Sequence, residues 1–186
     1  KDQQIIITAH LQEEQGSAND DGSGSGNILE LARVFNKLIK EGKIGSMLNI
    51  LGSKYTRQYQ EAAMQSRLKI PLLFGLDVVH GYKTTFPIPL GEAASWDLEA
   101  MEKSARIAAI EASSAGIHWT FAPMLDVARD ARWGRIIEGA GEDTYLGTKI
   151  AYARVRGFQG TDYSAKDRVM ATAIPDAWYA SKSRSV

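Results

Sequence analysis

A polar loop rich in opposite charges follows an apolar stretch in FAPMLDVARDARWGRIIEGAGEDTYL, residues 121–146. A loop that joins a strand to a helix usually needs about two to six residues. This loop runs from residue 126 to about residue 142, and its charged members are Asp126, Arg129, Asp130, Arg132, Arg135, Glu138 and Glu142. Such a density of charge on so long a loop predicts a site, and a solvated loop held by local ion pairs is the alternative.

Guanidinium groups flank an aromatic ring in Arg132-Trp133-Gly134-Arg135. Guanidinium forks and carboxylates suit pairs of hydroxyls, and an aromatic face packs against the apolar face of a sugar ring, so the pattern favours a sugar site. Phosphate is a competing ligand, which would make the protein a phosphate-binding α/β enzyme. No glycine-rich phosphate loop or lysine motif accompanies the arginines, however.

The carboxylates at the end of this loop have simpler interpretations. Asp143 follows Glu142 at the start of a predicted helix, and the pair is expected to cap that helix rather than to act in catalysis. Glu138 fits either role. The chain has no Gly-x-Ser-x-Gly elbow and no histidine clearly placed to activate a serine, which argues against nucleophilic serine chemistry.

A second polar group, Asp77-Val-Val-His80, follows another apolar run. Asp77 is predicted to accept hydrogen bonds from the hydroxyls of a polar ligand. A metal site would need two further ligands, and His10 and His118 have no suggestive spacing, so we predict no metal. His80 by itself is interpreted as a buried structural residue whose Nδ1 is bonded to the backbone.

Apolar runs alternate with amphipathic segments along the chain. Strands are expected at residues 44–51, 71–76, 117–125 and 169–173, and helices at about 31–42, 56–68, 98–112 and after residue 143, with an irregular segment at 80–97. This alternation predicts a parallel sheet covered by helices, although the pattern does not distinguish an open sheet from a barrel. In both, ligands bind at the carboxyl ends of the strands, where Asp77 and Asp126 fall.

Composition excludes several classes of protein. The 186 residues suffice for one domain with its own core, and Lys+Arg and Asp+Glu each number 22, so no basic field would recruit nucleic acid or a membrane surface. The absence of cysteine excludes disulfides, thiolate metal sites and a cysteine nucleophile. No apolar run approaches the roughly 18 residues of a membrane span, and no signal peptide is visible.

Several segments together resemble a known family: GKIGSMLNI, SRLKIPLLFGLDVVHGY, FPIPLGEAASWD, WTFAPMLDVARDARWGRIIEGAGEDTYL and VRGFQG. They resemble the N-terminal domain of family-3 glycoside hydrolases, the β-glucosidase and β-xylosidase group, and run in family order from about Gly42 to Gly160. The resemblance implies an α/β fold, a partial (β/α)8 TIM-type barrel of roughly the first half, with a glycone pocket at the strand ends. It implies no cofactor.

The resemblance also implies roles for individual residues. By position, Asp77 and Arg135 look like residues that bind the glycone, and Lys83 falls where some members have a second basic residue. The residues expected to have structural roles near the site are His80, Trp133 and Asp143. The form Asp-Val-Val-His-Gly resembles the glucosidase branch more than the hexosaminidase branch, and Asp130-Ala131-Arg132 replaces the commoner Asp-Pro-Arg.

The chain departs from the family after the strand expected at 169–173. In the family, a strand like this one is followed by Lys-His-Phe, whereas this chain has Ile174-Pro175-Asp176. Residues 174–186 read like translation in a shifted frame. The family nucleophile and acid/base residues have no counterpart in this chain, so no catalytic residue is assigned. The expected divisions are an N-terminal arm and Gly/Ser-rich linker (1–27), the first half of the barrel (28–173) and a non-family tail (174–186).

Two functions therefore remain open. One is a retaining β-glucosidase that hydrolyses terminal β-linked glucosyl residues, with this chain carrying only part of the glycone-binding wall. The other is an inactive remnant with weak sugar binding or a structural role. The expected partner is a β-glucoside or oligosaccharide, with no nucleic acid and no membrane, and unpaired barrel edges predict self-association. The compartment stays unassigned, although the resemblance points to the periplasm or secretion.

Overall fold

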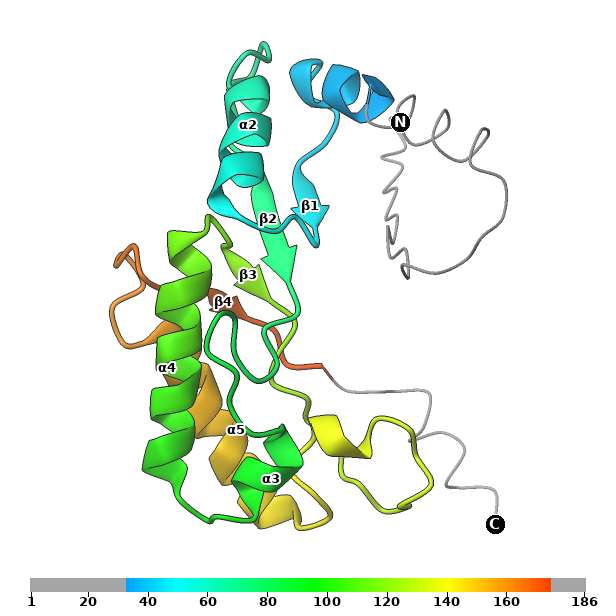
Figure 1. Cartoon of the computed structure of the whole chain (residues 1–186), viewed down its shortest axis with the longest axis vertical. Helices are drawn as coiled ribbons and strands as arrows, with labels where there is room; N and C mark the ends of the chain where they lie inside the picture. Colours follow the sequence, from blue (N-terminus) through cyan, green and yellow to red (C-terminus); the bar gives the residue numbers. More distant parts are fainter. Residues whose placement is uncertain (1–32, 175–186) are drawn as a thin grey trace. The chain divides into compact units, whose positions relative to one another are not determined.

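The computed structural model describes residues 33–174 (Figure 1). The arm and linker predicted at 1–27, and residues 175–186 of the predicted tail, lie outside the described residues, so the predicted division of the chain stays a prediction. The chain separates into two compact units, which adjoin in sequence at Phe74 and Gly75.

The first unit joins a strand and a helix through one glutamine. Its elements are a helix that covers 33–40, β1 (Ser46–Leu48), α2 (Ser53–Ala63) and the beginning of β2 (Leu73–Leu76). The Gln60 side chain of α2 pairs with the backbone of Leu72: its Oε1 accepts from the Leu72 N–H at 2.7 Å, and its Nε2 donates to the Leu72 carbonyl at 3.2 Å. Leu73 N–H donates to the Gly45 carbonyl at 3.0 Å, beside β1.

Within its described residues, 75–174, the second unit contains the remaining strands and three α-helices. Its elements are the end of β2, α3 (Pro89–Ala93), α4 (Leu98–Ser114), β3 (Trp119–Thr120), the 3₁₀ turn η1 (Ile136–Glu138), α5 (Thr144–Gln159) and β4 (Met170–Ala171). In this unit β3 lies between β2 and β4 and pairs in parallel with both. Trp119 is in register with Gly75 on one side and with Met170 on the other. The predicted α/β class with a parallel sheet is confirmed.

Helices α4 and α5 pack against each other (Figure 1). Asp97 caps α4 by accepting from the Ala100 N–H at 2.9 Å, and the face of α4 that carries its alanines is buried, with Ala109 and Ala112 fully inaccessible. Small side chains let the two helices approach closely. The helices come close at Gly157 of α5, where an added Cβ would lie 2.4 Å from the Glu102 carbonyl oxygen.

Several predicted elements have shifted or shorter bounds, such as α2 at Ser53–Ala63 instead of 56–68, and two predicted segments differ further. The segment at 80–97, expected to be irregular, contains α3, because Pro89 occupies the first turn of a helix, where its missing N–H and fixed φ are tolerated. The strand expected at 117–125 pairs regularly only over β3. Beyond it, the chain continues through the cis Ala122-Pro123 peptide and meets the sheet again only at a single bridge between Met124 and Ile174.

Candidate functional site

An open pocket of about 400 Å³ lies at the carboxyl end of β2. We call it the strand-end pocket; its lining residues are Asp77, Val79, His80, Gly81, Ile88, Pro89, Arg135, Ile137 and Glu138. The lining combines four polar or charged side chains with an apolar side. Two segments that the sequence singled out separately, at residues 77–81 and 135–138, therefore line one pocket.

Asp77 directly follows β2 and is exposed. The next residue is fixed in the sheet, because Val78 is fully buried and its N–H donates to Thr120 Oγ1 of β3 at 3.0 Å. This hydrogen bond links the end of β2 to β3 and so fixes the position of the backbone directly after Asp77. Asp77 thereby lies at the pocket, where the strand-end argument expected it.

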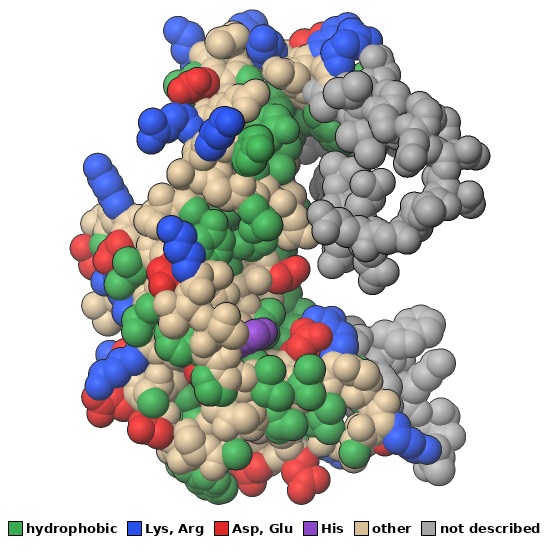
Figure 2. Space-filling model, viewed as in Figure 1, with side chains coloured by type: hydrophobic (Ala, Val, Ile, Leu, Met, Phe, Trp, Pro, Cys, Tyr) green, Lys and Arg blue, Asp and Glu red, His purple; other side chains and the backbone are tan. Residues whose placement is uncertain are grey.

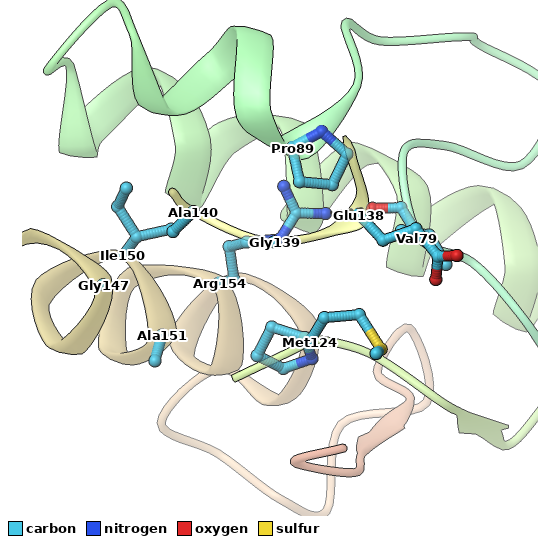
Figure 3. Close-up of a pocket in the computed structure, with 11 residues that line it drawn as sticks. Val79, Pro89, Met124, Glu138, Gly139, Ala140, Gly147, Ile150, Ala151 and Arg154 are labelled. Atoms are coloured by element: carbon cyan, nitrogen blue, oxygen red, sulfur yellow. Dashed lines mark hydrogen bonds between the residues drawn. The ribbon is translucent and has the colours of Figure 1, made fainter. Parts of the chain in front are cut away.

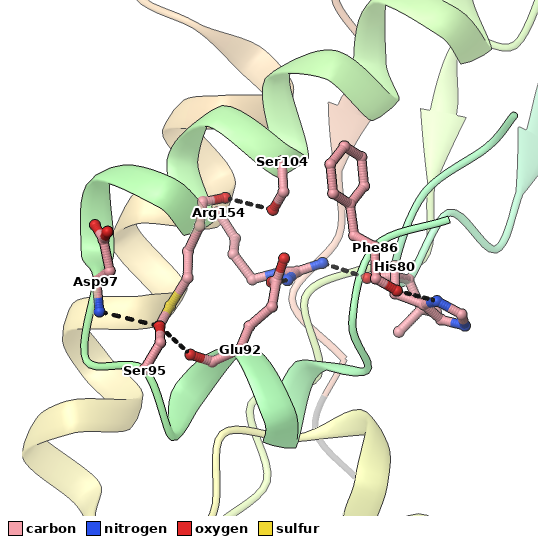
Figure 4. Close-up of polar contacts among 9 residues, drawn as sticks. His80, Phe86, Glu92, Ser95, Asp97, Ser104 and Arg154 are labelled. Carbon is pink, nitrogen blue, oxygen red and sulfur yellow. Dashed lines mark hydrogen bonds and ion pairs between the residues drawn. The ribbon is translucent and has the colours of Figure 1, made fainter. Parts of the chain in front are cut away.

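His80 lines the pocket and is exposed, so the prediction that it is buried is wrong. Its Nδ1 lies 3.1 Å from the Phe86 carbonyl, and the Phe86 N–H donates to the His80 carbonyl at 2.8 Å (Figure 4). A carbonyl oxygen only accepts hydrogen bonds, so Nδ1 carries the proton of this bond. This agrees with the predicted bond between His80 Nδ1 and the backbone. A tight turn, with Gly81 at φ 120° and a bridge between Gly81 and Thr85, keeps the ring at the surface.

The same turn is tied to α4 by Glu111. Its carboxylate accepts from the backbone N–H groups of Lys83 and Thr84, each at 2.8 Å, and from the Thr84 hydroxyl at 2.6 Å. The Thr84 hydroxyl, followed by these backbone donors, lowers the pKa of Glu111. Lys83 itself is exposed and does not line the strand-end pocket, so its role in substrate binding stays a prediction.

Arg135 is held by a bidentate ion pair with Glu138. Its Nε donates to Oε1 at 2.9 Å and its Nη2 to Oε2 at 2.7 Å, and Nη2 also lies 3.4 Å from Met124 Sδ. Both partners line the pocket, and their side chains are 47% and 29% exposed. Two parallel hydrogen bonds fix the plane of the guanidinium, so Arg135 is oriented before any ligand arrives.

Other residues of the charged loop hold its shape. Trp133 is buried, and its backbone N–H donates to the Asp130 carbonyl at 3.0 Å. Asp143 caps α5 by accepting from the Leu146 N–H at 2.7 Å. Arg132 is exposed and pairs with Asp130 through Nε at 2.9 Å and Nη2 at 2.7 Å, and it does not line the pocket.

The Asp130 carboxylate is expected to titrate near pH 2. Hydrogen bonds from the Arg132 side chain and backbone lower its pKa to about 2, below the ordinary value of about 3.9. Because the folded-state pKa is depressed, the stabilisation is complete above about pH 4 and is lost as the pH falls through about 2. NMR titration of the Asp130 carboxyl carbon measures this. Arg132→Ala should move the midpoint upward, and an unchanged midpoint would contradict the assignment.

Sequence reasoning missed a buried ion pair behind the pocket, between Glu92 of α3 and Arg154 of α5. Arg154 Nη1 lies 2.5 Å from Glu92 Oε2, and the two side chains are only 5% and 9% exposed. Burial lowers the pKa of Arg154, which Glu92 opposes. The signal was present: Arg154 falls on the apolar face of its helix, whose buried members are Ile150, Ala153, Arg154, Gly157 and Phe158.

Charges of both signs lie close together on the face shown in Figure 2. Within residues 33–174, no three carboxylate, imidazole or thiol side chains gather in a way that would hold a metal ion. No helix in that same range is long and apolar enough to cross a membrane.

Comparison with known proteins places these features in a family. The sequence model described as the glycosyl hydrolase family 3 N terminal domain matches residues 11–174. The chain belongs to this family.

Characterised relatives are glycosidases. The chain is 44% identical over 144 residues to a periplasmic beta-glucosidase of Salmonella typhimurium, a match that covers 77% of the chain and 19% of the relative. It is 35% identical to a beta-xylosidase of Formosa agariphila, over 73% of the chain and 20% of the relative. The chain thus spans about a fifth of the length of the curated relatives that it matches.

A solved structure extends the likeness to three dimensions. The beta-glucosidase from Listeria innocua in complex with glucose matches with a TM-score of 0.74 and 37% identity, over 84% of this chain and 22% of that one. The predicted fold class, a partial barrel of the (β/α)8 type, is confirmed by this likeness together with the parallel strands in chain order.

Proposed function

We propose that this chain forms part of the glycone-binding wall of a retaining β-glucosidase that hydrolyses terminal β-linked glucosyl residues. By glycone-binding wall we mean the surface of the strand-end pocket that carries Asp77 and Arg135. The observation that carries the proposal is their meeting in one pocket, although they lie in separate segments of the sequence. The resemblance of the sequence to family-3 glycoside hydrolases implied sugar binding for each of these two residues separately.

The chemistry of the lining suits a sugar. The exposed Asp77 carboxylate accepts hydrogen bonds from hydroxyls, and the guanidinium of Arg135, oriented by Glu138, donates them. Ile88 and Ile137 offer apolar contact to the C–H face of a ring. A volume of about 400 Å³ falls within the range of small-ligand pockets, roughly 300–1,000 Å³.

The reacting carboxylates are proposed to come from elsewhere. Retaining hydrolysis uses two carboxyl groups about 5–5.5 Å apart, one as nucleophile and one as acid/base. In the strand-end pocket, Glu138 is engaged by Arg135, and Asp77 is assigned to binding. Because both pocket carboxylates are assigned to other roles, we expect the 186-residue chain to bind sugar without hydrolysing it. Release of nitrophenol from 4-nitrophenyl β-glucoside, lost on Asp77→Ala, would contradict it.

Glucose titration tests the binding wall. Binding is followed by tryptophan fluorescence and by the imidazole NMR signals of His80, one of three histidines in the chain. We expect Asp77→Ala and Arg135→Ala each to weaken the affinity about tenfold or more, because each removes a charged hydrogen-bonding group. Lys83→Ala asks whether the remaining predicted residue also contributes.

Arg132→Ala is the matched control. It removes a guanidinium from the same loop, but one that pairs with Asp130 and does not line the pocket, so glucose affinity should be kept. Absence of saturable glucose binding by the unaltered protein would contradict the proposal. Stabilisation by phosphate that depends on Arg132 and Arg135 would favour a phosphate site instead. Sedimentation velocity on the same samples tests the proposed self-association through strand edges.

A further inference from the structure

Arg154 reaches from α5 to the backbone of the strand-end pocket. Its Nη1 pairs with Glu92 of α3, and its Nη2 donates to the carbonyl oxygen of Val79 (Figure 4). Val79 lies two residues after Asp77 and directly before His80, and all three line the pocket. One buried guanidinium thus joins α5, α3 and the segment 77–80, which we call the pocket segment.

The pocket segment is held at both of its ends. The N–H of Val78 belongs to the peptide unit that follows Asp77, and it donates to Thr120 Oγ1 at 3.0 Å. The carbonyl of Val79 belongs to the peptide unit that precedes His80, and it accepts from Arg154. Fixing these two peptide planes fixes the Cα positions from which the Asp77 and His80 side chains start.

A simple ion pair does not account for this arrangement. Burying two charges costs desolvation energy, and well-packed apolar residues often stabilise a core as well as a buried pair does. A lysine would offer one compact ammonium, whereas the planar fork of arginine presents two separate nitrogens, one to the Glu92 carboxylate and one to the Val79 carbonyl. The second branch of the fork, toward Val79, therefore suggests a role beyond stability.

Arg154 also lies behind the other segment of the pocket. It lines a small cavity of about 10 Å³, together with Val79, Pro89 and Glu138, the partner of Arg135. Figure 3 shows its guanidinium directed away from α5 toward Pro89. The side chain is thus in contact with the pocket segment and adjacent to the residue that orients Arg135.

We propose that Arg154, oriented by Glu92, is a positioning residue that fixes the pocket segment so that Asp77 and His80 are presented to the sugar. This inference rests on the proposed sugar-binding function. It assigns Arg154 no contact with the ligand, and its action passes through the Val79 carbonyl.

The double variant Glu92→Leu with Arg154→Met separates positioning from stability. It leaves no buried charge without a partner, so the fold is kept, yet it removes the donor to Val79. The matched control is Glu102→Leu with Arg156→Met, which replaces an ion pair of 3.5 Å between α4 and α5 in which the Glu102 side chain is 39% and the Arg156 side chain 45% exposed. Neither control residue lines the strand-end pocket.

Two measurements are made on each protein: glucose affinity, and hydrogen exchange of the Val78 and Phe86 amides. In the Glu92/Arg154 double variant we expect affinity to fall about tenfold and both amides to exchange about tenfold faster, as the loss of one charge-assisted hydrogen bond predicts. The control should resemble the unaltered protein. Unchanged exchange and affinity in a stably folded double variant would overturn the proposal.

The two proposals fail in different ways. If the unaltered protein does not bind glucose, the proposed function is wrong, and the amide exchange still decides whether Arg154 fixes the pocket segment. If the double variant does not fold, Arg154→Lys replaces it, since the ammonium keeps a positive charge beside Glu92 but lacks the second nitrogen of the fork, which donates to Val79. Faster exchange at Val78 in Arg154→Lys supports positioning, and unchanged exchange overturns it.

Discussion

Replacement of Gly157 by alanine is expected to lower the free energy of unfolding by about 1–3 kcal/mol, even though alanine is the better helix former. A Cβ at this position would lie 2.4 Å from the carbonyl oxygen of Glu102 and 2.6 Å from the Cβ of Ala105, both in α4. Neither atom is the end of a flexible side chain, so the helices would have to separate. Urea unfolding followed by circular dichroism measures the change.

Gly147 provides the matched control in the same helix. An added Cβ there meets nothing within 4 Å, so only the helix propensity acts, and Gly147→Ala should raise the free energy of unfolding by about 0.5–1 kcal/mol. The same substitution is thus expected to change stability in opposite directions at positions ten residues apart (147 and 157). Equal effects at the two positions would show that the close approach of α4 and α5 is wrong.

Periodicity was sufficient to predict most of the elements. The alanine face of α4 and the apolar positions of α5 recur at helical spacing, and burial in the sheet makes the strands read as continuous apolar runs. The position of Asp77 after β2 follows from the same pattern, because a polar residue directly after a buried strand falls at its carboxyl end. Local patterns therefore gave the fold class and one half of the strand-end pocket.

Contacts between distant residues could not be read in this way. The exposure of His80 depends on a tight turn at Gly81 and on the Glu111 clamp from α4. The neighbouring glycine is a local signal of the turn, but the clamp from a residue about 30 positions away has none. Likewise, an arginine on an apolar helix face indicates that Arg154 has a buried partner. The partner, Glu92, could not be identified from the sequence because it lies 62 positions away. Residue spacing also cannot predict a contact between a side chain and a distant backbone group, such as that of Arg154 with the Val79 carbonyl.

Loss of Arg154 alone is expected to be the most destabilising single change, lowering the free energy of unfolding by about 3–5 kcal/mol in Arg154→Met. The Glu92 side chain is only 9% exposed and would keep an uncompensated buried charge. Glu92→Leu alone leaves the Arg154 charge buried and should be similarly damaging. Thermal and urea unfolding of both variants measure these losses.

Combining the two substitutions should recover most of this stability, because the double variant buries no charge and gains apolar packing beside the cluster of Ala93, Met101 and Ile150. A coupling energy of about 4 kcal/mol or more is expected from the double-mutant cycle, because the two single losses together amount to at least about 6 kcal/mol and the double variant keeps only a small part of that loss. The exposed Glu102 and Arg156 pair should give no more than about 1 kcal/mol in the same cycle. Additive losses at Glu92 and Arg154 would mean that the two side chains do not form a buried pair, and the positioning of Val79 would then lack its support.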